Sequence, residues 1–231
     1  MAVQYQFLGH ATHLLKAGPH TLLVDPFLTS NPAASVAADE LEPSHILLTH
    51  GHFDHIEDTV AIAKRTQAKV IANFEIFNWL QGQGLSADQL HPQHLGGGFN
   101  HEFGYLKMTV AFHGSGLPDG SYGGMPGGFL IELEGKRIYI TGDTALFSDM
   151  ALYGKNGVDL LILPIGDNFT MGPDDALEAV RLVGPKRVVP CHYNTFPPIQ
   201  QDPQAFAQRV TQALPGVAVA VLAAGEGLTL D

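Results

Sequence analysis

Four potential metal ligands crowd into six consecutive residues: His50, His52, Asp54 and His55. They follow directly on a short apolar run that is typical of a buried strand. On a strand, His50 and His52 share one face. Gly51 then lets the chain turn, so that Asp54 and His55 can approach the same point. Imidazole and carboxylate together suit Zn²⁺, Mn²⁺, Fe or Ni²⁺ better than Ca²⁺ or Mg²⁺.

Three later positions share one arrangement, in which an apolar run ends at a single ligand-type residue: His113, Asp143 and His192. The runs that precede them are residues 109–112, 138–142 and 188–191. If these strands point the same way, their ends form one rim. Five imidazoles and two carboxylates then converge on one cleft.

Two of the converging groups are carboxylates, which need a compensating charge. Bringing Asp54 and Asp143 together at a poorly solvated rim is costly when neither is paired. The ligand loops contain no Lys or Arg, so a divalent cation is the expected partner. An isolated His-x-His pair is usually accidental, and Asp54 or Asp58 could instead cap the following helix. The three later residues favour the metal site over these simpler interpretations.

The rest of the chain predicts strands with helices interspersed. The expected strands cover residues 3–8, two short segments within 13–24 around a Gly18-Pro19 turn, 46–48, 70–72, 106–112, 128–133, 137–141, 160–165, 187–190 and 217–222. The expected helices cover residues 59–68, 74–80, 173–183 and 203–214. Pro190 argues against a central strand at 187–190, because proline cannot donate to a sheet ladder. Two sheets covered by outer helices fit this order best.

Composition fits one globular domain over residues 1–231, with 45% hydrophobic and 15% charged residues. The 12 basic residues are scattered and the net charge is −11, so no nucleic-acid-binding face is expected. No signal peptide is evident, and the apolar runs are shorter than the roughly 20 residues of a membrane span. The single Cys191 fits a reducing compartment. We therefore expect a cytoplasmic protein with a small-molecule substrate and neither a nucleic-acid nor a membrane partner, while assembly into a homo-oligomer stays open.

The ligand pattern resembles that of the metallo-β-lactamase superfamily. Further motifs resemble its metal-dependent hydrolase branch, a relative of L-ascorbate-6-phosphate lactonase: Gly9-His10-Ala11, Asp25-Pro26-Phe27, Gly142-Asp143-Thr144, and residues 163–173 and 192–197. The resemblance covers nearly the whole chain. It implies the four-layer αββα sandwich of that superfamily, an architecture of the mixed α/β and α+β classes. Cys191 departs from the Met expected in close relatives, and we interpret it as a small buried hydrophobe.

Carried over to this chain, the resemblance implies two divalent metal ions. One is held by His50, His52 and His113, the other by Asp54, His55 and His192, and Asp143 bridges them. Zn²⁺ is the first expectation for both ions, with Mn²⁺, Ni²⁺ or Fe as alternatives.

A binuclear site of this kind predicts hydrolysis. Two cations about 3.5–4 Å apart lower the pKa of a bridging water, so a hydroxide is the expected nucleophile. Asp54 is expected to orient it or relay its proton. His10 is expected either at the cleft, as substrate contact or proton donor, or in a surface turn. With a site charge of about +1 and no basic residue in the loops, an anionic group is favoured, and a lactone, ester, amide or singly charged phosphodiester fits better than a polyphosphate.

Other residues are candidates for supporting roles. Asp25 is expected to accept a hydrogen bond from the far nitrogen of a ligand histidine, or else to be a turn residue. Asn168, Tyr193 and Asn194 are candidates for substrate hydrogen bonds or for local turn capping. The glycine-rich segment 123–128 is either a lid over the cleft or a set of plain turns. We interpret three further histidines as surface residues: His91, His94 and His101.

Two other functions stay open at this point. The same ligand set could serve iron chemistry in an oxidoreductase or dioxygenase, although nothing indicates a flavin module or an electron-carrier domain. A metal-bound regulatory protein without turnover is the other alternative, and the complete ligand set weakens it.

Overall fold

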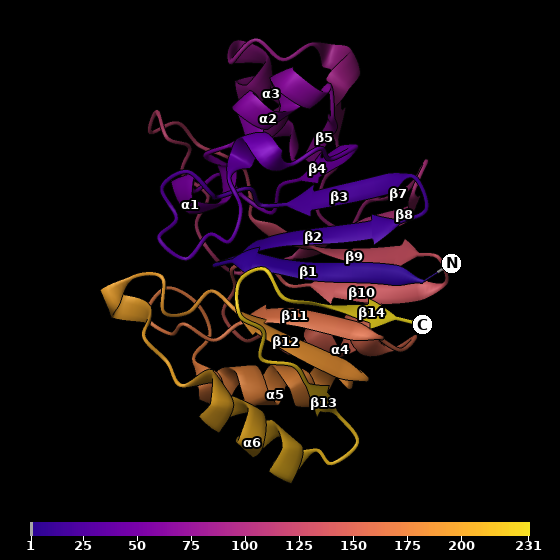
Figure 1. Ribbon diagram of the computed structural model, residues 1–231, viewed down its shortest axis with the longest axis vertical. Coiled ribbons are helices and arrows are strands. Elements are labelled where there is room, and N and C mark those ends of the chain that lie inside the picture. Colours follow the sequence, from indigo (N-terminus) through magenta and orange to yellow (C-terminus); the bar gives the residue numbers. More distant parts are fainter. Residues whose placement is uncertain (1) are drawn as a thin grey trace.

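Two β-sheets of seven strands each face one another in the computed structural model, which describes residues 2–231 (Figure 1). The first sheet has the order β14 (Gly227–Leu230), β1 (Val3–Gly9), β2 (Thr12–Ala17), β3 (His20–Val24), β4 (His45–Leu47), β5 (Lys69–Ala72) and β6 (Leu90–Pro92). The second has the order β13 (Ala218–Val219), β12 (Arg187–Cys191), β11 (Leu160–Pro164), β10 (Lys136–Ile140), β9 (Gly127–Leu133), β8 (Gly104–Val110) and β7 (Gly98–His101). Both sheets are mixed, with antiparallel strands followed by a parallel set.

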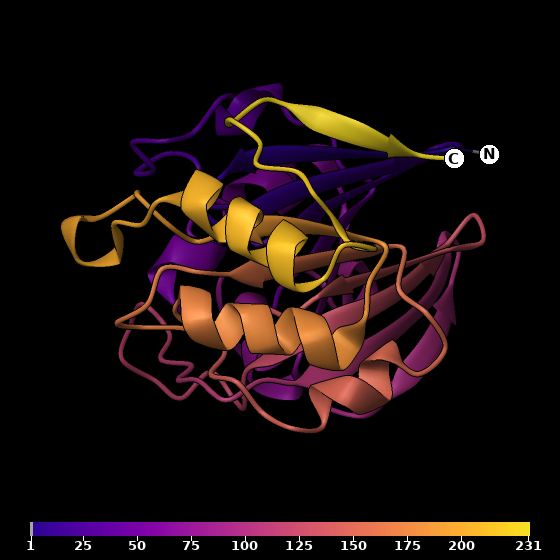
Figure 2. The same ribbon diagram turned by 90° about the horizontal axis from the view of Figure 1, so that it is seen from below.

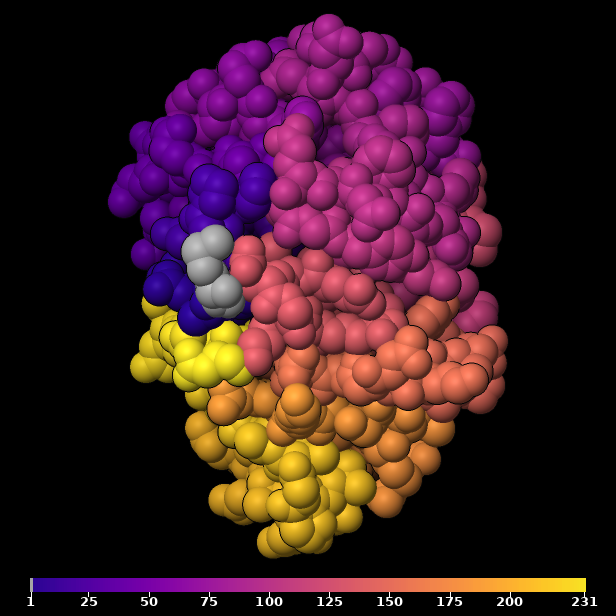
Figure 3. Space-filling model, turned by 90° about the vertical axis from the view of Figure 1, so that its right-hand side faces the viewer, coloured from indigo at the N-terminus to yellow at the C-terminus, as the bar shows by residue number. Residues whose placement is uncertain are grey.

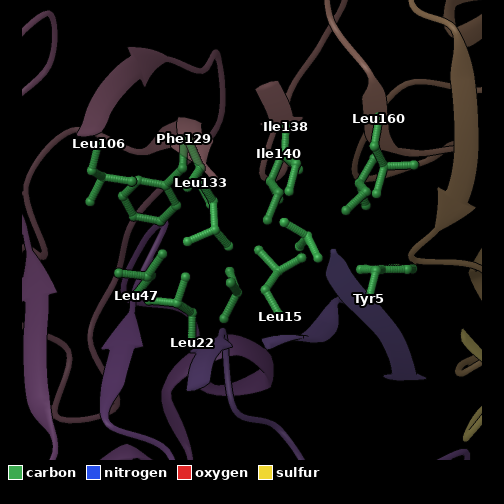
Figure 4. Packing of buried hydrophobic residues seen from close by; sticks show 14 of the residues in the cluster. Tyr5, Leu15, Leu22, Leu47, Leu106, Phe129, Leu133, Ile138, Ile140 and Leu160 are labelled. Atoms are coloured by element: carbon green, nitrogen blue, oxygen red, sulfur yellow. The ribbon is translucent and has the colours of Figure 1, made fainter. Parts of the chain in front are cut away.

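The central core lies between the sheets. Figure 4 shows Tyr5, Leu15, Leu22 and Leu47 of the first sheet facing side chains of the second, among them Phe129. Side chains alternate between the two faces of each strand, so neighbouring residues enter different cores. In β11, for example, Ile162 joins the central core and Leu163 the outer one.

Helices cover the outer face of each sheet. Figure 1 shows α2 and α3 on one flank of the molecule and α5 and α6 on the opposite flank. The bounds of the helices are α1 (Phe53–Ile56), α2 (Thr59–Thr66), α3 (Phe74–Gly82), α4 (Met150–Gly154), α5 (Pro173–Val183) and α6 (Pro203–Ala213), with short 3₁₀ turns at Ala38–Glu40, Ala87–Gln89 and Pro197–Ile199. The amphipathic α5 begins with a proline and ends at Gly184 in a left-handed conformation, as its sequence predicts. The expected four-layer αββα sandwich is thus confirmed.

The carboxyl ends of the strands before the ligand residues all lie at one edge of the sandwich. Strands β1, β3 and β4 run in the same direction within the first sheet, and β8, β10, β11 and β12 do so within the second. This edge is marked in Figure 1 by α1, which follows β4. The opposite end, shown in Figure 3, brings the indigo N-terminal segments next to the yellow C-terminal segment.

The expected elements are present, but strands β6, β7 and β14 and helices α1 and α4 lie outside the expected ranges, and one expected strand differs at the C-terminus. The strand expected over 217–222 is only β13, because the chain then leaves the second sheet and crosses to the first, where β14 pairs with β1. Figure 2 shows this crossing in yellow. Pro190 is tolerated in β12 because its nitrogen points to the side of β13, where no strand continues. On that side the Val188 carbonyl accepts from the N–H of Ala220, which already lies beyond the end of β13. Within residues 2–231, no helix is both long and apolar enough to cross a membrane.

Candidate metal centre

The seven residues singled out by the sequence meet at the shared edge of the two sheets, where they form two groups of ligand atoms. In the first group, the ligand atoms of His50, His52 and His113 lie within 4.8 Å of one another. In the second group the same holds for Asp54, His55 and His192, together with a fourth residue, His10. Residues that follow strands of both sheets, separated by up to 142 positions in the chain, therefore converge as the spacing predicts.

Asp143 lies between the two groups. Its Oδ2 atom is 3.0 Å from His192 Nε2 and 3.4 Å from His55 Nε2, which belong to the second group. The same oxygen is 3.6 Å from Nε2 of His113, which belongs to the first. One carboxylate oxygen thus reaches both sets of imidazoles, which is the geometry that a bridging ligand requires.

Asp25 orients two of these histidines from behind. Its Oδ2 accepts a hydrogen bond from His55 Nδ1 at 2.8 Å, so the Nε2 atom of His55 is left for the cluster. The Thr49 hydroxyl donates to the same carboxylate and lies 3.0 Å from His50 Nδ1. Because that hydroxyl proton is used by Asp25, its oxygen accepts from His50, whose Nε2 then points inward. Asp25 itself is 1% exposed.

Unusual backbone conformations bring these side chains inward. His10, Asp25 and His192 have φ of 57°, 47° and 54°, in the left-handed region that non-glycine residues rarely adopt. Such residues cost about 1–3 kcal/mol each and concentrate at functional sites. Gly142, which precedes Asp143, has a φ of 64°. A Cβ atom at position 142 would lie 2.4 Å from the Gly127 carbonyl oxygen. Only glycine fits there.

The histidines of the cluster keep its two carboxylates, Asp143 and Asp54, ionised. Burial alone would raise the pKa of Asp143, but His192 and His55 outweigh it and leave this pKa well below the ordinary value. Burial likewise opposes ionisation of Asp54, yet the hydrogen bond from His10 and the nearby ring of His192 lower its pKa. The carboxylates act on the histidines in the same way. Burial alone would lower the pKa of His192, but Asp143 outweighs burial, and the pKa of His192 is raised to about 9. Without metal, histidine protons therefore supply the charge that balances the carboxylates.

The donor atoms fit a cation. Within the described residues, His55 Nε2 and both ring nitrogens of His192 are buried and make no hydrogen bond of good geometry. His50 Nε2 and His52 Nδ1 face each other at 3.0 Å. Buried ring nitrogens without hydrogen-bond partners are costly unless a cation accepts their lone pairs. Imidazole and carboxylate ligands are those of a transition-metal site.

His10 is buried behind the cluster, not in a surface turn. It is 1% exposed, with Nε2 3.1 Å from Asp54 Oδ2 and Nδ1 2.9 Å from the Thr195 hydroxyl. Its ring also lies against that of His192, with centroids 4.0 Å apart. Burial, together with His192, lowers its pKa to about 4. His10 is therefore placed to position Asp54, and it is absent from the lining of the cavity beside the cluster.

A cavity of about 680 Å³ opens onto the cluster. Its lining residues are His52, Phe53, Asp54, His113, Gly116, Leu117, Pro118, Asp143, Phe169, His192, Phe196 and Pro198. The sequence prediction missed the aromatic members, although Phe169 and Phe196 lie inside the motifs at 163–173 and 192–197. Those motifs singled out Asn168, Tyr193 and Asn194 instead.

Those three polar residues lie outside this lining. Asn168 is exposed at the surface, and Tyr193 packs on the outer core of the second sheet. The side-chain oxygen of Asn194 accepts a hydrogen bond from the Gln201 backbone N–H, which is the local turn capping held open as their alternative role. The expectation of substrate hydrogen bonds thus finds no geometric support at these positions, because the chain turns them away from the cavity.

The segment 123–128 is tied down. The buried Asn73 side chain donates to the carbonyl oxygens of Gly123 and Met125, and Gly127 N–H donates to Thr49. Leu117 and its neighbours border the cavity in its place. The plain-turn interpretation of 123–128 therefore fits, and the lid does not.

The remaining residues of interest lie apart from the cluster. Cys191 is 5% exposed and belongs to the central core, as expected of a small buried hydrophobe. His94 is exposed, as expected, but His91 and His101 are half-buried and pack against each other with ring centroids 4.7 Å apart. Surface placement therefore holds only in part for these two, because Phe99 of β7 packs against His91 and Phe103, between β7 and β8, stacks on His101.

Comparison with known proteins agrees with this geometry. The family described as beta-lactamase superfamily domain matches residues 20–193. A UPF0173 metal-dependent hydrolase of Thermus thermophilus is 51% identical over 229 residues, which cover 99% of this chain and all of that protein. Among solved structures, Igni18, a metallo hydrolase of the archaeon Ignicoccus hospitalis, has a TM-score of 0.90 at 32% identity and covers 100% of this chain and 99% of its own.

The fold also occurs in a protein with different chemistry. CmlA, a diiron β-hydroxylase of Streptomyces venezuelae, has a TM-score of 0.78 at 15% identity, over 99% of this chain and 54% of its own. At this identity the likeness concerns the fold alone.

Proposed function

Because the chain belongs to the metal-dependent hydrolases of the β-lactamase superfamily, we propose that it hydrolyses a small molecule with a binuclear metal centre. The observation that carries the proposal is the position of Asp143 Oδ2 between two complete groups of donor atoms. A single ion would leave one group unused, with buried nitrogens facing carboxylates at a cost.

The two groups divide the ligands. His50, His52 and His113 would hold one divalent cation, and Asp54, His55 and His192 the other, with Asp143 shared by both. Zn²⁺ is the first candidate for this donor set, and Mn²⁺, Ni²⁺ and Fe are the alternatives. When bound, such ions polarise the scissile carbonyl or phosphoryl oxygen and lower the pKa of water toward neutrality.

The chain's own residues do the positioning. Asp54 faces the cavity with 15% of its side chain exposed, so its free oxygen can accept a proton from the attacking water. His10 bonds to Asp54 Oδ2 from the buried side and keeps the carboxylate turned toward the cleft. Asp25 and Thr49 hold the ring orientations of His55 and His50.

The cavity supports a small-molecule substrate. Its volume of about 680 Å³ lies within the usual range of ligand pockets. Within the described residues no Lys or Arg lines it, so a nucleic-acid backbone would find no partner there. A lactone, ester, amide or phosphodiester is the proposed substrate class. The unpaired, buried Cys191 is compatible with the reducing cytoplasm as the proposed location.

Elemental analysis followed by an activity panel tests the proposal. Gently purified protein should contain about two transition-metal ions per chain and should hydrolyse at least one lactone, ester, amide or phosphodiester with the native metal restored. Oxygen uptake is measured in parallel because a diiron hydroxylase shares the fold. Stoichiometric iron with substrate-dependent oxygen uptake would overturn hydrolysis, and a metal-loaded protein that turns over nothing in the panel would indicate a binding role instead.

A further inference from the structure

The described residues that line the cavity beside the metal centre are of two kinds, candidate metal ligands and apolar residues. Its polar side chains are His52, Asp54, His113, Asp143 and His192, all of which belong to the candidate ligand set. The other side chains are Phe53, Leu117, Pro118, Phe169, Phe196 and Pro198, and Gly116 completes the wall. Once the ligands are committed to metal, no side chain of this lining is left to hydrogen-bond a hydroxyl group or pair with a charge.

The aromatic part of the wall is held in place from below. Phe27, which is fully buried, contacts the ring of Phe53 at a centroid distance of 5.7 Å and that of Phe196 at 6.2 Å. Phe196 also packs edge-on against His10 at 5.4 Å. Two of the three rings that border the cavity, Phe53 and Phe196, are thus positioned by a buried aromatic residue.

These rings nonetheless present much of their surface to solvent. Phe53 is 54% exposed and Phe169 55% exposed. Large apolar side chains that gather in an exposed concave surface mark a binding site, because water is released when a ligand covers them. A sugar phosphate or another polar substrate would have to give up its hydration against these rings without receiving hydrogen bonds in return.

We propose that this cleft selects substrates whose group next to the scissile bond is uncharged and apolar, of aryl or branched-alkyl size, and that Phe53, Phe169 and Phe196 recognise that group. The proposal rests on the proposed hydrolase function and names its substrate class. The proposal differs from the expectation of an anionic substrate, which followed from the net positive charge of the metal centre. That positive charge acts on the reacting atoms only, and the cavity wall has no basic side chain to pair with a further anionic group.

A series of esters with one leaving group tests the preference. The acyl groups are acetyl, phenylacetyl and 4-carboxyphenylacetyl, and each kcat/KM is divided by the rate of hydroxide-catalysed hydrolysis of the same ester. The phenylacetyl ester should exceed the acetyl ester by about tenfold or more, as filling a hydrophobic pocket does, and the carboxylated ester should fall back. Equal values for the first two esters, or preference for the third, would overturn the proposal.

Variants locate the recognition. Phe169→Ala should lower the ratio of phenylacetyl to acetyl efficiency by about tenfold, mainly through KM, with metal content unchanged. Phe169→Lys should shift the preference toward the carboxylated ester. Phe74→Ala is the matched control, because Phe74 is 51% exposed but lies outside the cavity lining. An equal effect of Phe169→Ala and Phe74→Ala on the ratio would count against the assignment.

A binding measurement separates this inference from hydrolysis itself. Acetohydroxamic acid and phenylacetohydroxamic acid carry the same metal-binding group, differ only in the apolar substituent and need no turnover. We expect the metal-loaded protein to bind the phenyl compound about tenfold or more tightly, and Phe169→Ala to reduce that difference. Equal affinities would overturn the apolar-cleft proposal. A retained difference in a protein that hydrolyses nothing in the panel of lactones, esters, amides and phosphodiesters would contradict the proposed hydrolysis and leave the cleft assignment standing.

Discussion

Asp25 and His55 are joined by a hydrogen bond of 2.8 Å between Oδ2 and Nδ1, and both side chains are buried. The bond fixes which nitrogen of His55 carries the proton and turns the other toward Asp143, 3.4 Å away. An acidic residue that follows β3 thereby controls a candidate metal ligand on α1. Carboxylates in this position commonly raise the basicity of the histidine and its affinity for metal.

Replacing this carboxylate should weaken metal binding without removing a ligand. Asp25→Asn keeps the size of the side chain but loses the charged acceptor, and the affinity should fall by about 10–100-fold. Competition with a chromogenic chelator measures it. Asp88→Asn, at an exposed position, is the control. Wild-type affinity in Asp25→Asn would show that His55 does not need this partner.

Removal of the shared carboxylate should have a larger effect. Asp143→Ala is expected to lose at least one equivalent of metal and to abolish turnover, because both groups of donors use that oxygen. Elemental analysis and the activity panel measure the two effects. The exposed Asp149→Ala variant should keep full metal content. Full content and activity in Asp143→Ala would be incompatible with a bridging role.

Metal binding should release protons near neutral pH. Asp143 and Asp25 outweigh burial and raise the pKa of His55, and Asp143 does the same for His192. With a pKa of about 9, His192 is protonated in the metal-free protein at pH 7.5 and must lose that proton to ligate. Calorimetric titration in buffers of different ionisation enthalpy should show at least one proton released per chain. Enthalpies that do not depend on the buffer would rule out this protonation state.

The stability of the metal-free protein should fall at alkaline pH. The pKa of His192 is about 9 in the folded chain, against an ordinary value of 6.5 for histidine. A raised folded-state pKa stabilises fully below 6.5, and the contribution is lost as the pH rises through about 9. The free energy of unfolding should drop across this window by up to about 3 kcal/mol, at roughly 1.4 kcal/mol per pKa unit. Denaturant titrations of chelator-treated protein measure it, and His192→Gln should show a shallower drop. A rise in stability over the same window would refute the assignment.

Much of the fold could be predicted because its signals are local. The short apolar runs of β10 and β11, and the proline start and glycine end of α5, each depend on a few neighbouring residues. The ligand positions could be predicted for the same reason, since His113, Asp143 and His192 each follow their strand closely. The pairing of β14 with β1 could not, because Val3 and Leu230 lie at opposite ends of the chain.

The residues around the metal centre were predicted less well, because the backbone conformation of each turn decides which side chain faces the cavity. Asn168 and Phe169 are neighbours, yet only Phe169 lines the cavity. Polarity suggested the asparagine, whereas backbone geometry selects the phenylalanine. His10 illustrates the same difficulty: its left-handed φ turns the ring into the interior, where Asp54 and Thr195 bond to it. A turn motif alone does not reveal this burial.

We propose that seven side chains hold two cations, and anomalous scattering from crystals of the metal-loaded protein tests this proposal most directly. An anomalous difference map at the absorption edge of the bound metal should show two peaks per chain. One peak should touch His50, His52 and His113, the other Asp54, His55 and His192, with Asp143 in contact with both. A single peak, or peaks away from these residues, would contradict the account.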